Sequence, residues 1–211
     1  MIFSKNFIIP LFLFFSVSVV AQKPPPGTVR LKPSKTEKYA TFIDKNMITL
    51  QDWVDYLWWL GREKDTVKFK AMLPDGLHNL QIYSMDWEKN IDYIDTLGIL
   101  KWRWRYPAFR DYPLIGISYE QVIEYCAWRT DRVNELLKLR KKKYTVVYTL
   151  PTEEDCGRGY FLLERSSCSE IFRELTAEKT VMIKKGHRIE YQPYQGAEVN
   201  LGFRCVAEIH Q

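Results

Sequence analysis

The chain has 211 residues, with 31 basic and 26 acidic side chains and a formal net charge of +5 at pH 7. This modest balance does not indicate nucleic acid as a partner, because nucleic-acid binding selects a strongly basic surface. The length is sufficient for one domain with its own hydrophobic core, even when a leader segment is set aside.

Residues 1–21 have the pattern of a secretory signal peptide. Lys5 precedes an apolar run over residues 7–20, and the small residue Ala21 closes the run. As a membrane anchor the run is short, because a spanning helix needs roughly 20 apolar residues. No cysteine follows it that would carry a lipid. We therefore expect cleavage after Ala21 and a secreted or periplasmic protein whose contact with the membrane is only indirect.

Residues 22–27 form a proline-rich leader that favours an extended conformation, and a single domain is predicted over residues 28–211. Short strands are predicted at residues 28–31 and 42–45. Thr49 and Asp52 then have the spacing of a helix N-cap and its reciprocal partner. The apolar side chains of this helix fall on one stripe: Leu50, Trp53, Val54, Leu57 and Trp58.

Charged and aromatic side chains alternate over residues 101–106, and the alternation includes Trp102, Arg103, Trp104 and Arg105. In an extended segment, alternation places the rings on one face and the cations on the other. One interpretation is a strand with its tryptophans in the core. The other is a surface that stacks on a sugar or a peptide with cationic support. These four residues are a candidate binding surface.

Residues 112–129 read Tyr-Pro-Leu-Ile-Gly-Ile-Ser-Tyr-Glu-Gln-Val-Ile-Glu-Tyr-Cys-Ala-Trp-Arg. A short apolar strand is predicted at residues 114–117. A helix then runs from Ser118 to about Leu139, because Ser118 and Gln121 have the spacing of a capping box. The cations at the end of this helix offset its dipole. The alternative interpretation of that cationic run is an anionic partner, such as lipopolysaccharide or a polyanionic glycan.

A strand is predicted at residues 144–150, and Thr152 is placed to cap the helix that follows. Gly157 and Gly159 weaken the continuation of that helix. Further strands are predicted at residues 161–163, 181–184 and 198–206. The three histidines are far apart in the sequence and have no metal-ligand spacing: His78, His187 and His210.

Three stretches resemble the formylglycine-generating enzyme (sulfatase-modifying factor) family. They are the central stretch at residues 112–129, Leu-Pro-Thr-Glu-Glu at 150–154 and Asn-Leu-Gly-Phe-Arg-Cys at 200–205. The resemblance implies an α+β fold of the C-type-lectin-like kind, with small antiparallel sheets, two main helices and much irregular structure.

The chain has four cysteines, which in an oxidising compartment allow three disulfide pairings. In the resembled family, the cysteine of the Tyr-Cys motif is bonded to the cysteine that follows Gly-Phe-Arg. The resemblance therefore implies a disulfide between Cys126 and Cys205. That pairing leaves Cys156 and Cys168 to each other.

Enzymes of this family oxidise a cysteine of a client protein with dioxygen, and late cysteines beside an Arg-Gly-Gly-Ser-Trp segment hold their copper. This chain lacks that segment and has no cysteine between Cys168 and Cys205. We therefore predict no catalytic residue, no metal site and no cofactor. The expected function is a non-catalytic domain that binds an envelope protein or glycan, as in a gliding- or secretion-type scaffold. The alternative is a formylglycine-generating-type oxidase with copper at a relocated Cys156/Cys168 site.

Overall fold

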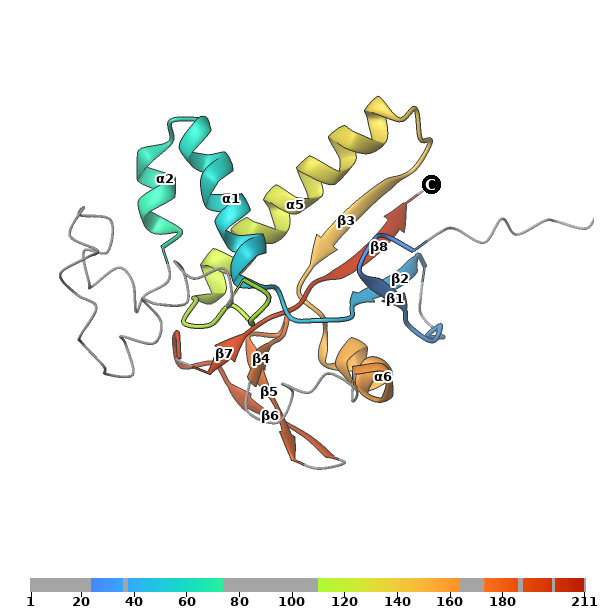
Figure 1. Ribbon diagram of the computed structural model, residues 1–211. Helices are drawn as coiled ribbons and strands as arrows, with labels where there is room; N and C mark the ends of the chain where they lie inside the picture. Colours follow the sequence, from blue (N-terminus) through green and yellow to red (C-terminus); the bar gives the residue numbers. More distant parts are fainter. Residues whose placement is uncertain are drawn as a thin grey trace, which may run out of the picture.

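The structure is a computed structural model that describes residues 24–35, 38–73, 110–163, 173–185, 188–198 and 200–210, without the side chains of residues 160–163. The described part is an α+β fold, as predicted, with four helices and two four-stranded sheets (Figure 1). The helices are α1 (Leu50–Arg62), α2 (Thr66–Ala71), α5 (Tyr119–Leu139) and α6 (Glu153–Leu163). None of the helices in these ranges is long and apolar enough to cross a membrane.

The first sheet has the strand order β1-β2-β8-β3, and all its pairs are antiparallel. It consists of β1 (Thr28–Arg30), β2 (Ala40–Asp44), β8 (Val206–His210) and β3 (Thr145–Thr149). Helix α5 covers the outer edge of β3 (Figure 1). There the Asn134 side chain accepts from the Val146 N–H and donates to its carbonyl, both at 2.8 Å. Side chains of α5 thus satisfy part of the outer edge of β3, which makes this edge a poorer template for aggregation.

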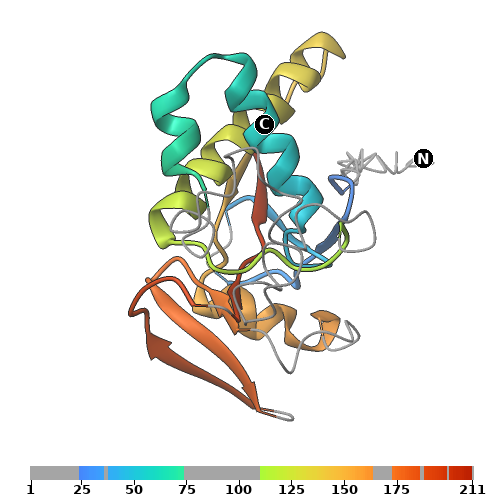
Figure 2. The ribbon, with the colours of Figure 1, turned by 60° about the vertical axis from the view of Figure 1, so that its left-hand side comes forward.

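The second sheet has the strand order β6-β5-β4-β7. It consists of β6 (Arg188–Pro193), β5 (Thr180–Lys185), β4 (Arg173–Leu175) and β7 (Leu201–Gly202), and only β4 and β7 are parallel. Strands β5 and β6 form a hairpin that projects away from α1 and α5 (Figure 2). Helix α6 contacts this sheet, because the Tyr191 hydroxyl donates to the Glu153 carbonyl at 3.0 Å.

Both predicted capping boxes are present. Thr49 accepts from the Asp52 N–H at the start of α1, and Ser118 accepts from the Gln121 N–H at the start of α5. The predicted apolar stripe of α1 is only partly right. Its buried side chains are Leu50, Trp53, Tyr56, Leu57 and Leu60, whereas Trp58 is 62% exposed. Trp58 instead lies beneath the Arg62 guanidinium, 4.9 Å from the ring centroid.

Aromatic side chains from α1, from α5 and from the segment between β7 and β8 form the centre of the core. Trp53 of α1 stacks on Tyr125 of α5 with ring centroids 5.3 Å apart, and Phe203 meets Tyr125 edge-on at 5.5 Å. The Trp53 indole N–H donates to the Met72 carbonyl at 3.1 Å, so the largest buried ring has a partner for its polar atom. The segment before β8 is thereby packed against the two long helices.

Three strand predictions need correction. Residues 114–117 are not a strand, because their backbone bonds to separate segments: the Leu114 N–H donates to Ile48 (2.8 Å) and the Gly116 N–H donates to Glu198 (3.1 Å). Residues 161–163 are the end of α6, which continues through both of its glycines. The strand predicted at 198–206 is divided into β7 and the first residue of β8.

Candidate functional site

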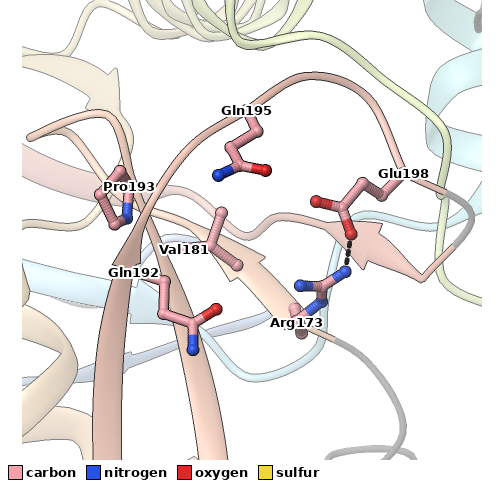
Figure 3. Close-up of a pocket in the computed structure, with 6 residues that line it drawn as sticks. All are labelled: Arg173, Val181, Gln192, Pro193, Gln195 and Glu198. Atoms are coloured by element: carbon pink, nitrogen blue, oxygen red, sulfur yellow. Dashed lines mark ion pairs between the residues drawn. The ribbon is translucent and has the colours of Figure 1, made fainter.

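A small polar pocket lies on the second sheet, where β4, β5 and β6 meet the segment that follows β6. Its volume is about 220 Å³. Figure 3 shows its lining side chains, which are Arg173, Val181, Gln192, Pro193, Gln195 and Glu198. They come from the first residue of β4, from β5, from the end of β6 and from the loop beyond it.

An ion pair between Arg173 and Glu198 forms one wall of the pocket (Figure 3). The Arg173 guanidinium also donates to the Asn200 side-chain oxygen, at 2.9 Å from Nη2 and 3.3 Å from Nε. The backbone holds both partners in place: the Glu198 carbonyl accepts from the Gly116 N–H at 3.1 Å, and the Arg173 N–H donates to the Asn200 carbonyl at 2.9 Å. The side chains are 25% and 35% exposed, so a ligand reaches them without disturbing the core.

The side chains of Gln192 and Gln195 lie on one side of the ion pair, with Val181 between them (Figure 3). Each amide donates and accepts, whereas the guanidinium only donates and the carboxylate accepts. The volume is below the 300–1,000 Å³ that is typical for drug-sized ligands, which suits one small polar group. No lining side chain is a thiol, an imidazole or a hydroxyl. The described lining of this pocket thus offers hydrogen-bond donors and acceptors for a small polar ligand.

Sequence reasoning did not single out any of the residues that line this pocket. The lining is assembled from β4, β5, β6 and a loop, so no local spacing marks it. The available signal was weak: residues 192–198 read Gln-Pro-Tyr-Gln-Gly-Ala-Glu, a polar, turn-forming stretch between two predicted strands. The predicted surface of Trp102, Arg103, Trp104 and Arg105 lies outside the described residues.

The structure brings Cys126 and Cys205 together in the core. Their sulfur atoms are 3.7 Å apart, and both residues are buried free cysteines. The two side chains of the first implied pair are thus adjacent but not bonded, and the disulfide stays a prediction. The second implied pair is not described, because Cys168 lies outside the described residues.

The environment of Cys156 is that of a structural thiol. It lies on α6 with 1% of its surface exposed. Burial raises the pKa of the thiol, and the negative charge of Glu174 raises it further. The thiolate is the form that binds soft metals and attacks electrophiles, and this environment disfavours it.

Buried charges surround the Gly-Phe-Arg-Cys motif. Arg204 is 1% exposed and forms an ion pair with Glu174, with Nη2 donating at 2.8 Å. Its Nη1 also donates to the carbonyls of Asp44 and Lys45 at 3.1 and 2.9 Å. The Asp44 carboxylate in turn accepts from the Cys205 N–H at 2.9 Å. Arg204 thus joins the end of β2 to the second sheet, a role in architecture rather than in chemistry.

Polar residues of the central stretch, residues 112–129, also join separate structural elements. Arg129 of α5 makes a two-point contact with the Asp44 carboxylate, at 2.6 and 3.0 Å, and its guanidinium lies 4.2 Å from the centroid of the Tyr148 ring. The Gln121 amide donates to the carbonyls of Ala71 and Leu73, which holds the end of α2. These contacts fix how α5 packs on the first sheet and on α2.

Metal-binding groups of three or more His, Cys, Asp or Glu side chains are absent from the described ranges. No protein-family model matches the sequence, and neither the curated proteins nor the solved structures contain a significant match. The likeness to the formylglycine-generating enzyme family therefore rests on the three motifs.

Proposed function

We propose that this chain is an exported, non-catalytic binding domain of the sulfatase-modifying-factor type, with a C-type-lectin-like fold, which holds a protein or glycan partner in the cell envelope. Two observations support the proposal. Each of the three family-like stretches contributes to one hydrophobic core, through Cys126, Leu150 and Cys205, and Cys126 lies beside Cys205. The polar pocket of Arg173 and Glu198 supplies a place for a ligand.

The composition of the pocket carries the proposal. A guanidinium, a carboxylate and two amides are among the groups that line about 220 Å³. Such groups bind neighbouring hydroxyls, because each hydroxyl both donates and accepts a hydrogen bond. A protein interface usually buries about 800 Å² on each partner, which is far more surface than a pocket of this size offers. Between the two partner classes, the pocket favours a glycan.

The oxidase alternative receives no support from the described residues. It requires a reactive thiolate, whereas Cys156 is buried and burial raises the pKa of its thiol. A direct assay separates the two functions. The non-catalytic proposal predicts that copper(I)-treated protein leaves a cysteine-containing client peptide unchanged under dioxygen. Conversion of that cysteine to an aldehyde would establish the oxidase instead.

Glycan binding is tested by saturation-transfer NMR with a panel of envelope-type mono- and disaccharides. We expect contacts with at least one sugar, and a loss of affinity of about tenfold or more in Arg173→Gln and Glu198→Gln, since each removes a charged hydrogen-bond partner. Glu190→Gln is the matched control, because Glu190 lies on β6 in an exposed ion pair with Lys185 outside the pocket. Folded protein that binds no sugar in the panel, or binds equally well in all variants, would refute the glycan proposal.

A further inference from the structure

The connection from α5 to β3 forms a cationic tip, which we define as residues 138–143. Five of its six residues are Lys or Arg, and the sixth is Leu139. All six are exposed, Leu139 to 80%, and Leu136 one turn earlier is 45% exposed. None of the five cations pairs with an acid in the described part of the chain. Glu135, the nearest acid on α5, is already paired with Arg132 at 2.8 Å.

Helix capping does not account for this concentration of charge. The Lys141 N–H donates to the Lys138 carbonyl and the Lys142 N–H to the Leu137 carbonyl, both at 2.9 Å, so the backbone itself satisfies the helix end. Lys138 is the basic residue of the last turn, where the dipole acts. Lys141 has φ of 53°, a left-handed position that usually holds glycine. Lys141 therefore occupies a position at which the backbone geometry favours glycine.

A further cation, Lys38, lies at the end of the first sheet that is next to β3. Because β8 pairs with β3, His210 lies opposite the first residue of β3. The ring of Tyr39 stacks on His210 at 3.8 Å, and the Lys38 amine lies 5.2 Å from the Tyr39 centroid. The acid here, Glu208, is 3.3 Å from the His210 ring nitrogen. Through Tyr39 and His210, Lys38 is thus placed at the end of the first sheet where β3 begins, two residues after the tip.

We propose that the cationic tip docks on the surface of a phospholipid bilayer that contains anionic headgroups. Clusters of Lys and Arg are attracted to such a surface, and exposed apolar side chains between them enter the boundary between headgroups and acyl chains. Leu136 and Leu139 are three residues apart and so lie on one side of the helix. A soluble polyanion would use the cations but would leave both leucines in water. This proposal differs from the sequence-based expectation of indirect membrane contact.

Docking by the tip is compatible with ligand binding at the pocket. The second sheet, which carries the pocket, and the α5–β3 connection lie at opposite ends of the molecule in both views (Figures 1 and 2). A bilayer at the tip leaves the second sheet facing away from the membrane. The two proposals are therefore independent and are tested by different variants.

The test is co-sedimentation of the exported chain, after removal of the signal segment, with phosphatidylcholine vesicles with and without phosphatidylglycerol. We expect binding that requires phosphatidylglycerol and falls as salt is raised. Each cation contributes about fivefold to partitioning, so Lys142→Gln with Lys143→Gln is expected to weaken binding by more than tenfold. Leu139→Ser, which changes no charge, is also expected to weaken it severalfold.

The matched control is Lys185→Gln with Arg188→Gln, which removes the same charge from the β5–β6 hairpin at the other end. Equal losses in the two double variants would show a response to net charge and would overturn the proposal. The proposal would also be overturned if folded protein bound vesicles equally well with and without phosphatidylglycerol. It would likewise be overturned if Leu139→Ser did not weaken vesicle binding and soluble dextran sulfate displaced the protein fully. Arg173→Gln is expected to retain vesicle binding, which separates failure of the pocket proposal from failure of this one.

Discussion

The sulfur atoms of Cys126 on α5 and Cys205 before β8 lie 3.7 Å apart in the core, although the residues are 79 positions apart in the sequence. A disulfide bond needs about 2 Å between sulfurs, so only a small shift of the two side chains separates contact from a bond. Burial raises the pKa of the Cys205 thiol, which keeps it protonated while it is reduced. Forming the bond from two thiols is a two-electron oxidation, so it requires an oxidant such as an oxidising compartment supplies.

We predict that oxidised protein contains the Cys126–Cys205 bond and that reduction lowers the free energy of unfolding by about 4 kcal/mol, because a long loop is then no longer closed in the unfolded chain. A non-reducing peptide map and urea unfolding measure the two effects. Cys126→Ser and Cys205→Ser should each cost a similar amount, and the double variant little more, since all three lose the same bond. Additive losses would argue against the bond.

A second prediction concerns the buried pair of Glu174 and Arg204. Burial alone would raise the pKa of the Glu174 carboxyl, but Arg204, and then Lys184, lower it below its usual value of 4.5. The folded state therefore favours the deprotonated form. The resulting stability is complete above the pKa of the unfolded chain and is lost as the pH falls through the folded value.

Glu174→Gln should therefore lower the free energy of unfolding near neutral pH by about 3–5 kcal/mol, because it leaves the buried Arg204 without a counter-charge. Its stability should also fall less steeply than that of the unchanged protein as the pH drops below about 4.5. Urea unfolding across an acid pH series measures both effects. Parallel pH profiles for the two proteins would contradict the assignment of this acid dependence to Glu174.

Local signals in the sequence predicted where α1 and α5 begin, whereas α2 was not predicted and long-range contacts decided the rest. The caps at Thr49 and Ser118 depend on residues three positions away, so sequence spacing is enough to find them. Residues 114–117 are apolar like a strand, but their partners are Ile48, Glu198 and Leu201, which sequence alone does not bring together. The pocket follows the same rule, because Arg173 meets Glu198 only once β4 and the loop after β6 are in place.

The third prediction concerns Gly202 of the Gly-Phe-Arg-Cys motif. A Cβ at this position would lie 2.5 Å from the Leu114 carbonyl oxygen, a backbone atom that cannot rotate away. Gly202→Ala should therefore lower the free energy of unfolding by about 1–3 kcal/mol through overpacking.

The control for this substitution is Gly157→Ala. Gly157 lies on α6, and a Cβ there would have nothing within 4 Å. Alanine should stabilise this helix by about 0.5–1 kcal/mol, because glycine loses more backbone freedom on folding. Urea unfolding of the two variants should thus give changes of opposite sign. Equal stability of Gly202→Ala and the unchanged protein would mean that Leu114 does not approach β7 as closely as described.

The fourth prediction separates stability from membrane binding at Lys141. Its left-handed φ of 53° strains any residue with a Cβ, by roughly 1 kcal/mol. Lys141→Gly relieves that strain and should raise the melting temperature by a few degrees, about 2–4 °C. The same change removes one cation from the tip, so it should weaken binding to phosphatidylglycerol vesicles about fivefold. Lys141→Gln isolates the charge, because it should weaken vesicle binding equally while leaving the melting temperature almost unchanged. If Lys141→Gly stabilises the fold yet keeps full affinity for the vesicles, Lys141 does not contribute to membrane binding.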